Sequence, residues 1–439
     1  MMEIPARHPR SGDCIIREVL PGGLRVKVLV DYPALGLRRQ PEYLDELVDR
    51  QTGRPINLKV PETRPATPLP KPVGTPSWQQ ARQTLLALRL GQSTAESVSD
   101  LSVGMAEVES ACRWGMGRAI SGKLSFLLFE SPYGMGKSHA LAHLKQLALK
   151  QTMAVGTVTL DGTGVSLCEP MSLVTGLAHA IEFPDERKDE GLPQRLAQRA
   201  GRGLSITGGE MLHQLLMAID RDCVDNPDKW ELIEDYLSLD ATASHLRREL
   251  GIKVPSLKAR FREDRPARCS TILREWASAC TVGEMGARNG LVVLLDEADV
   301  DYARRGRHQK DMEQRSELLR AFRSIANSPP GDGGFARLLI AVAITPGASQ
   351  HDPIQEFKSE LGEHLKVVRL RELSAGELLE LGKKVVQLYQ RAYEVTGKQE
   401  ERAAEVLEKC LLFTSRQAEG RNPRKFIRLL LEKLDVLYA

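Results

Sequence analysis

The pattern of apolar and polar positions divides the chain into a β-rich N-terminal part, a mixed α/β part and a helical C-terminal part. In the first part, two strand-like runs at residues 14–20 and 24–32 flank Pro21-Gly22-Gly23. Adjacent glycines tolerate the positive φ angles of a tight turn, so these runs predict a β-hairpin.

Continuous apolar runs lie farther along the chain, at residues 124–129, 155–160, 291–295 and 337–344. Runs of this length are typical of parallel strands that helices cover on both faces. Helical spacing of apolar residues covers the remaining stretches, which are 78–120, 139–150, most of 170–285 (with Trp230, Leu237 and Trp276 as expected core residues) and everything from Glu372 onward. The pattern predicts an α/β fold, a parallel sheet flanked by helices with a helical lid at the C-terminus.

A proline-rich stretch separates the first two parts. Residues 60–76 contain six prolines, which stiffen the chain and remove backbone donors, so we expect an extended linker there. The predicted domains are a small β-barrel-like module at 1–58, a linker at 59–77, an α/β domain at 78–371 with a helical insertion at about 185–285, and a helical lid at 372–439.

Composition narrows the class of protein. Apolar residues make up 42% of the chain and charged residues 27%, as in ordinary globular proteins, and a formal charge of +3 does not by itself imply a nucleic-acid partner. The longest apolar run, residues 338–344, is too short to span a bilayer, and the N-terminus has no apolar signal core. The seven cysteines include no C-x-x-C pair, so we expect them reduced and mostly buried in a cytoplasmic protein.

The apolar run at 124–129 leads directly into ESPYGMGKSHAL, residues 130–141, and a helical pattern follows. This is the context of a phosphate-binding loop, in which glycines let backbone amides surround the phosphates and the helix N-terminus adds partial positive charge. Lys137 is expected to contact the β- and γ-phosphates, and Ser138 a Mg²⁺ ion. The residues expected to bind the nucleotide are Ser131, Pro132, Tyr133, Gly134, Met135, Gly136, Lys137, Ser138 and His139.

Three further features complete the candidate site. The segment GLVVLLDEAD, residues 290–299, is an apolar strand that ends in adjacent carboxylates. We expect Asp296 to hold Mg²⁺ and Glu297 to polarise the attacking water. A third strand ends at Thr345, which would touch the γ-phosphate or the water, and Arg424 lies in the first turn of a C-terminal helix, within reach of the phosphates.

These four features in this order describe an AAA+ ATPase, with Walker A and Walker B motifs and two sensor residues. The expected cofactors are ATP and Mg²⁺, and the expected reaction is ATP hydrolysis. The catalytic candidates are Lys137, Glu297, Thr345 and Arg424, and the metal ligands are Ser138 and Asp296.

Four segments together resemble a narrower family. They are FLLFESPYGMGKSHAL at 126–141, VGTVTLDGTGVSLCEPMSLVTGLAHAIEFP at 155–184, NGLVVLLDEAD at 289–299 and NPRKFIRLLLEKLD at 422–435. Over about 100–439 the chain resembles the ATP-binding proteins of BREX-type phage-defence systems, the BrxD-like group, which look like the origin-recognition/STAND-like branch of AAA+ proteins. The resemblance implies an ATPase that acts on DNA beside other defence proteins, namely a methyltransferase, a phosphatase-like protein and a helicase. A shorter segment, HPRSGDCIIREVLPGGLRVKVLVDY at 8–32, resembles the Tudor-like barrels appended to some helicases.

Two departures from the AAA+ pattern leave the mechanism open. Ser131 replaces the first loop glycine, which the turn tolerates if the φ of this serine is negative. Residues 345–368, where many AAA+ proteins carry a trans-acting arginine finger, contain no arginine and only two cations, Lys358 and Lys366. A finger would come from elsewhere in the chain or from a partner protein, or trans activation would be weak. The candidates within the chain are Arg320, Arg323, Arg369 and Arg371.

Because residues 345–368 contain no arginine finger, a second function is an alternative to ATP hydrolysis. A slow nucleotide-gated switch or scaffold would bind ATP, assemble defence partners and turn over little. Both acids of the second motif favour hydrolysis, whereas the missing finger favours the switch. A homo-oligomer is compatible with either function.

Two arginine clusters are candidate contacts for the phosphates of double-stranded DNA. Arg195, Arg199 and Arg202 share one helical face by spacing, and Arg304, Arg305 and Arg307 follow the acidic motif. Either cluster would make binding salt-dependent, and the alternative is a solvated face or a salt-bridged loop. His139 and His143 have the i, i+4 spacing of metal ligands, but HALAH lacks the glutamate of a zinc-binding H-E-x-x-H motif, so we expect no zinc.

Overall fold

The computed structural model divides the chain into two compact units, Met1–Gly74 and Thr75–Ala439. It describes residues 4–8, 12–20, 27–32, 37–43, 48–49, 77–91, 95–161, 164–185, 190–201, 210–219, 226–281, 287–303, 309–327, 337–347, 352–393, 398–415 and 422–438. Most of the predicted linker, at 59–76, lies outside these residues.

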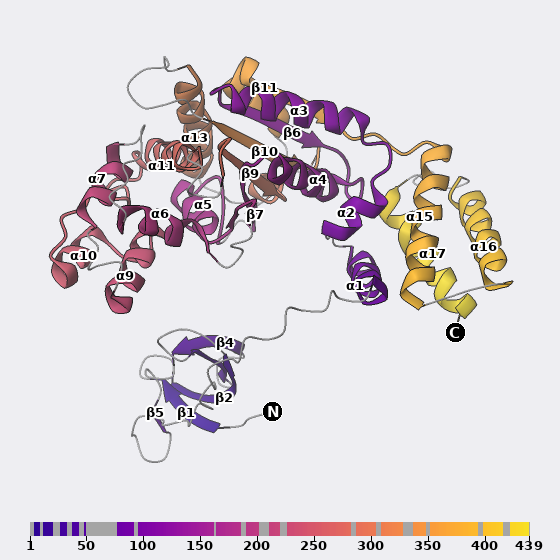
Figure 1. The fold of residues 1–439 in the computed structure, drawn as a ribbon, viewed down its shortest axis with the longest axis horizontal. Coiled ribbons are helices and arrows are strands. Elements are labelled where there is room, and N and C mark those ends of the chain that lie inside the picture. Colours follow the sequence, from indigo (N-terminus) through magenta and orange to yellow (C-terminus); the bar gives the residue numbers. More distant parts are fainter. Residues whose placement is uncertain are drawn as a thin grey trace. The chain divides into compact units, whose positions relative to one another are not determined.

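The N-terminal unit contains a five-stranded antiparallel sheet with the order β4-β3-β2-β1-β5 (Figure 1). Its strands are β1 (Ile4–His8), β2 (Gly12–Leu20), β3 (Lys27–Tyr32), β4 (Leu37–Tyr43) and β5 (Val48–Asp49). The predicted hairpin is confirmed, because β2 and β3 pair antiparallel with Leu20 opposite Lys27. Closure of this sheet into a Tudor-like barrel stays a prediction.

The second unit contains a six-stranded sheet with the order β11-β6-β10-β9-β7-β8. All neighbouring strands are parallel except β8, which pairs antiparallel with β7. The strands are β6 (Ser125–Glu130), β7 (Ala154–Thr159), β8 (Ile181–Glu182), β9 (Leu291–Asp296), β10 (Leu338–Ile344) and β11 (Leu365–Arg369). The predicted parallel sheet flanked by helices is therefore confirmed.

Side chains along each strand alternate between the two faces of this sheet. Both faces therefore carry apolar side chains, and helices cover both. Phe126 and Leu128 pack on the side of α5 (Pro170–Ala178), α11 (Arg265–Ala279), α13 (Gln309–Asn327) and α14 (Pro353–Leu361). Leu127 and Phe129 pack on the side of α3 (Ala106–Ile120) and α4 (Lys137–Lys150). The short helices α12 (Val300–Ala303) and η4 (Gly362–His364) lie beside the ends of β9 and β11.

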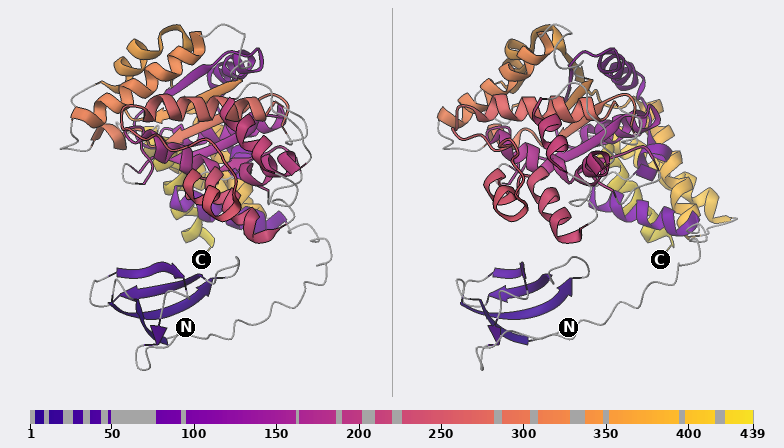
Figure 2. Two further views of the ribbon diagram at one scale, coloured as in Figure 1. Left: turned by 90° about the vertical axis from the view of Figure 1, so that its left-hand side faces the viewer. Right: turned by 60° about the vertical axis from the view of Figure 1, so that its left-hand side comes forward.

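The predicted insertion consists of helices, but its last helix, α11, packs against the sheet. Its helices are α6 (Leu192–Gly201), α7 (Glu210–Ala218), α9 (Pro227–Leu237), α10 (Ala243–Leu250) and α11. Trp276 of α11 is buried in the core that includes the sheet, Leu237 is buried, and Trp230 packs partly buried against the same core. Figures 1 and 2 show α6, α7, α9 and α10 grouped together beyond α11.

A separate apolar core holds the helical lid together. The lid helices α15 (Ala375–Tyr393), α16 (Lys398–Ser415) and α17 (Pro423–Tyr438) pack with α1 (Ser77–Leu90) and α2 (Ala95–Leu101). Segments more than 280 residues apart therefore lie side by side, as Lys384 and Ser102 do through a hydrogen bond (Figure 1). Within the described residues, no helix combines the length and apolarity needed to cross a membrane.

Candidate functional site

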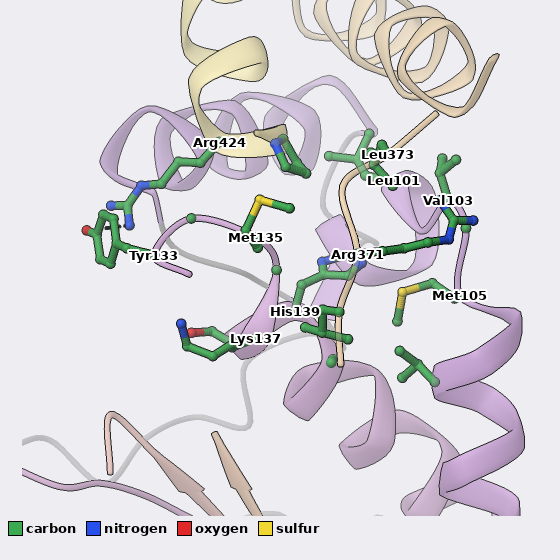
Figure 3. Close-up of a pocket in the computed structure, with 18 of the residues that line it drawn as sticks. Leu101, Val103, Met105, Tyr133, Met135, Lys137, His139, Arg371, Leu373 and Arg424 are labelled. Carbon is green, nitrogen blue, oxygen red and sulfur yellow. Dashed lines mark hydrogen bonds between the residues drawn. The ribbon is translucent and has the colours of Figure 1, made fainter. Parts of the chain in front are cut away.

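The carboxyl ends of four parallel strands meet at one edge of the sheet. Glu130 of β6 lies opposite both Ile344 of β10 and Arg369 of β11, and β9 ends beside them at Asp296. Binding sites in parallel α/β sheets form beyond this edge. Here the edge borders a cavity of about 790 Å³, which α1, α2, the loop between β6 and α4, and the lid helices α15 and α17 complete (Figure 3).

The loop between β6 and α4 has the backbone that its glycines predict. Gly134 has φ +81° and Gly136, the residue before α4, has φ +93°, a conformation that side chains disfavour. Ser131 does not have a positive φ. Instead its amide donates to Ile344 O at 3.4 Å and extends the strand ladder. A serine therefore fits the first position of the motif without backbone strain.

Lys137 begins α4 and folds back over the loop. Its Nζ lies 2.8 Å from Ser131 O and 3.2 Å from Pro132 O, so these two residues act through their carbonyls. Burial lowers the pKa of Lys137, and the charges of Asp299, Asp296 and Glu297 oppose that shift. The carboxylates on the other side of the cavity therefore favour the protonated, charged form of Lys137.

The acids after β9 lie where the motif predicts, and Glu297 has an unusual backbone. Its φ is +57°, the left-handed region that costs a non-glycine residue roughly 1 kcal/mol or more. Its amide donates to Asp296 Oδ1 at 2.9 Å, which fixes the sharp turn after the strand. The Glu297 side chain is exposed in the cavity wall. Such strain at a strand end is typical of a functional site.

Asp299 is a cavity residue that the sequence motif contained but to which we assigned no role. Its Oδ1 accepts a hydrogen bond of 3.3 Å from the amide of Thr345, so the carboxylate ties the end of β9 to the end of β10. It is also the charge that most strongly raises the pKa of Lys137. Its spacing, three residues after Asp296 with a helical turn beginning, was the available signal.

Arg424 lines the cavity, and its guanidinium contacts the loop between β6 and α4. Nη1 lies 2.6 Å from the Tyr133 hydroxyl, and Cζ lies 4.8 Å from the centre of the Tyr133 ring (Figure 3). The neighbouring Asn422 donates from Nδ2 to Tyr133 O at 2.9 Å. Asn422 had no predicted role, and Tyr133 was predicted to bind the nucleotide but not to contact the lid, because contacts between residues 289 apart leave no local pattern.

The far part of the cavity is apolar. It is lined by Leu88, Leu101, Val103, Met105, Leu373 and Ile427. These side chains come from the α1 and α2 segments and from the lid, so the cavity depends on the packing of the lid against these two segments. A flat heterocyclic ring suits such walls.

The four arginine-finger candidates are all engaged by acidic residues or carbonyls of the same chain. Arg320 makes two bonds of 3.0 Å to Glu360, and Arg323 contacts Glu360 O at 3.5 Å. Arg369 pairs with Glu130 and Arg371 pairs with Glu377, and both arginines line the cavity of their own chain. Arg371 also holds the pKa of Glu377 down to about 2 by hydrogen bonding.

The predicted DNA contacts are corrected in one case. Arg195 is buried, makes two bonds of 2.7 Å to Asp185, and lies over the Phe183 ring. It is therefore a structural residue of the insertion and not a phosphate contact. The side chain of Arg199, and all of Arg202, Arg304, Arg305 and Arg307, lie outside what the structure describes.

His139 lies in the cavity wall and is held neutral. Its Nε2 is 3.0 Å from Ser102 Oγ, which itself donates to Val98 O at 2.6 Å, so the imidazole is the donor to serine. His143, one turn later, lies 3.7 Å from Glu109. Burial, with a smaller effect of His143, lowers the pKa of His139 to about 4.

This shift predicts a pH dependence of stability. A histidine in the unfolded chain has a pKa of about 6.5, so it becomes protonated below that pH. His139 in the folded chain stays neutral until about pH 4. Stability is therefore lost as pH falls through this window, by about 3 kcal/mol at its lower end. Denaturant titration at pH 7.5 and pH 4.5 should show a smaller loss for His139→Gln. His179→Gln, at an exposed histidine, should retain the wild-type loss, and an unchanged loss in His139→Gln would contradict the assignment.

Comparison with known proteins gives no family. No family model matches the sequence, and no curated protein matches it. A chain from the E. coli MS115-1 HORMA:CdnC:Trip13 complex is similar with a TM-score of 0.36 and 8% identity, over 77% of this chain and 91% of that chain. A TM-score of this size does not indicate a shared fold, so the case for a function depends on the site itself.

Proposed function

We propose that the chain is a Mg²⁺-dependent ATPase of the AAA+ class. The observation that carries this proposal is the meeting of Lys137, Asp296, Glu297 and Thr345 in one cavity at the carboxyl edge of a parallel sheet. These residues lie at or shortly after the carboxyl ends of β6, β9 and β10, which are far apart in sequence. A chance Gly-Lys-Ser turn would have no reason to face two carboxylates and a threonine.

The donors fit a magnesium nucleotide. The Ser138 hydroxyl is exposed in the first turn of α4 and Asp296 ends the strand β9, and both line the cavity with the oxygen ligands that Mg²⁺ prefers. The loop amides and Lys137 suit phosphates, and the apolar part of the cavity suits a base. When bound, Mg²⁺ would neutralise charge on the phosphate oxygens.

The remaining residues have distinct roles in this proposal. Glu297, which is exposed in the cavity wall, orients the attacking water and accepts its proton. Thr345 contacts the γ-phosphate or that water from the next strand. Arg424 contacts the phosphates once it leaves Tyr133, so that lid position reports nucleotide state.

Release of phosphate from ATP by the purified protein, with and without Mg²⁺ and with and without duplex DNA, tests the proposal. We expect turnover that requires Mg²⁺. The resemblance to BREX-type ATP-binding proteins extends the proposal to an anti-phage defence complex on DNA, for which stimulation by duplex DNA is the expected sign. No turnover in any condition, despite ATP binding, would favour the second function.

That second function, a slow nucleotide-gated switch or scaffold, is favoured by one observation. Among the described residues, all four finger candidates are bonded within the chain. A protein without a trans-acting arginine would hydrolyse ATP slowly unless a partner supplied one.

Asp299 gives a prediction about the proposed reaction. Removing its carboxylate in Asp299→Ala leaves the Thr345 amide without its acceptor, so we expect turnover to fall about tenfold while KM for ATP changes little. Asp299→Asn keeps an acceptor oxygen and should keep most of the turnover. Steady-state kinetics of both variants check this, and equal losses in the two would show that the charge matters instead of the hydrogen bond.

A further inference from the structure

The lid helix α17 begins directly on the phosphate loop. Asn422 precedes the helix, and its Oδ1 accepts from the amides of Arg424 at 3.0 Å and Lys425 at 3.2 Å. The same side chain donates to Tyr133 O at 2.9 Å. One asparagine therefore caps the lid helix and binds it to the loop.

Arg424 strengthens this contact and adds a third segment. Besides the Tyr133 hydroxyl, its guanidinium bonds Leu90 O at the end of α1, with Nη2 at 3.4 Å. Gly91, with φ +72°, leaves the space that the guanidinium fills, because an added Cβ would lie 2.0 Å from Nη2. The guanidinium thus lies close to the Gly91 backbone and also contacts the ring of Tyr133, a contact that Figure 3 shows.

Both cations expected at the phosphates are therefore held by oxygens of the protein itself. Lys137 contacts Ser131 O and Pro132 O, and Arg424 contacts the Tyr133 hydroxyl and Leu90 O. In this position the guanidinium bonds protein oxygens through both Nη atoms, so it must turn away from them to contact a phosphate with those atoms. A nucleotide that recruits Arg424 must first break these bonds.

We propose that Tyr133, Asn422, Arg424 and Leu90 form a lid clamp that competes with the nucleotide. The clamp holds α17 on the phosphate loop in the nucleotide-free protein, and nucleotide binding replaces it with contacts from Arg424 to the phosphates. Tyr133 is then a positioning residue for the lid. This inference rests on the proposed nucleotide site and adds its regulation.

The clamp predicts that nucleotide binding becomes tighter when the clamp is weakened. Because Tyr133→Phe keeps the ring but removes the hydroxyl, it weakens only the nucleotide-free state. Binding of a fluorescent ATP or ADP analogue with Mg²⁺, followed by stopped flow, should become about three- to tenfold tighter through a faster association rate. A tyrosine that merely shapes the loop would give weaker binding when changed.

Gly91→Ala tests the position of the Arg424 guanidinium by adding a methyl group beside it. Its methyl group would displace the Arg424 guanidinium, so association should again become faster. Gly251→Ala is the matched control, since Gly251 has φ +71° and nothing within 4 Å of an added Cβ. Tyr236→Phe removes a hydroxyl that donates to Pro255 O outside the cavity and so controls for loss of a hydrogen-bonded hydroxyl, and both controls should bind as the wild type does.

The outcomes separate the two proposals. Tight nucleotide binding by the wild type with no gain in Tyr133→Phe and Gly91→Ala overturns the clamp alone. Absence of saturable binding in the wild type overturns the proposed nucleotide site and the clamp with it. Faster association in both variants and in neither control supports the clamp.

Discussion

Lys137→Ala is expected to abolish nucleotide binding. Lys137 begins α4, and its Nζ bonds the carbonyls of Ser131 and Pro132 in the loop that we propose binds the phosphates. A charge-assisted contact to phosphate is worth several kcal/mol in a partly buried site, so affinity for ATP with Mg²⁺ should fall at least about 100-fold, or about 3 kcal/mol. Isothermal titration calorimetry measures this directly.

A lysine on the same helix provides the control. Lys145 of α4 pairs with Glu182 at the surface, away from the cavity, so Lys145→Ala should bind ATP as the wild type does. Retained micromolar affinity in Lys137→Ala would contradict the loop assignment. Equal thermal unfolding midpoints of the two variants would exclude loss of folding as the cause.

The placement of charged and polar residues near the ends of three strands could be predicted from the sequence because each motif is local. Glycines with positive φ, a lysine at a helix start and acids after an apolar run depend on neighbours a few residues away. The parallel sheet then brings such ends together without further information, since all its long strands point the same way. Lys137 and Asp296 therefore share a cavity although 159 residues separate them.

The rest of the site depends on long-range packing and leaves little trace in the sequence. The strand β11 was not predicted, because it is a five-residue edge strand that is only partly buried, so its apolar pattern is weak. Arg195 was interpreted as a surface residue from helical spacing alone, yet Asp185 and Phe183 enclose it. The contact between Arg424 and Tyr133 required the lid to be placed on the loop, which no periodicity indicates.

Glu297→Gln is expected to separate binding from hydrolysis. The amide keeps the size and the left-handed backbone of Glu297 but cannot accept a proton from water, so turnover should fall about 100-fold or more. Affinity for ATP with Mg²⁺ should stay within about threefold, because Lys137 and Asp296 remain in place.

Single-turnover release of phosphate under saturating ATP measures the chemical step in this variant. Glu317→Gln, at an exposed glutamate of α13, is the control and should hydrolyse ATP at the wild-type rate. Loss of hydrolysis with retained binding would establish Glu297 as the catalytic base and favour the ATPase over the switch. Unchanged turnover in Glu297→Gln would instead leave the strained acid without a catalytic role, and the nucleotide would then act as a gate for the lid.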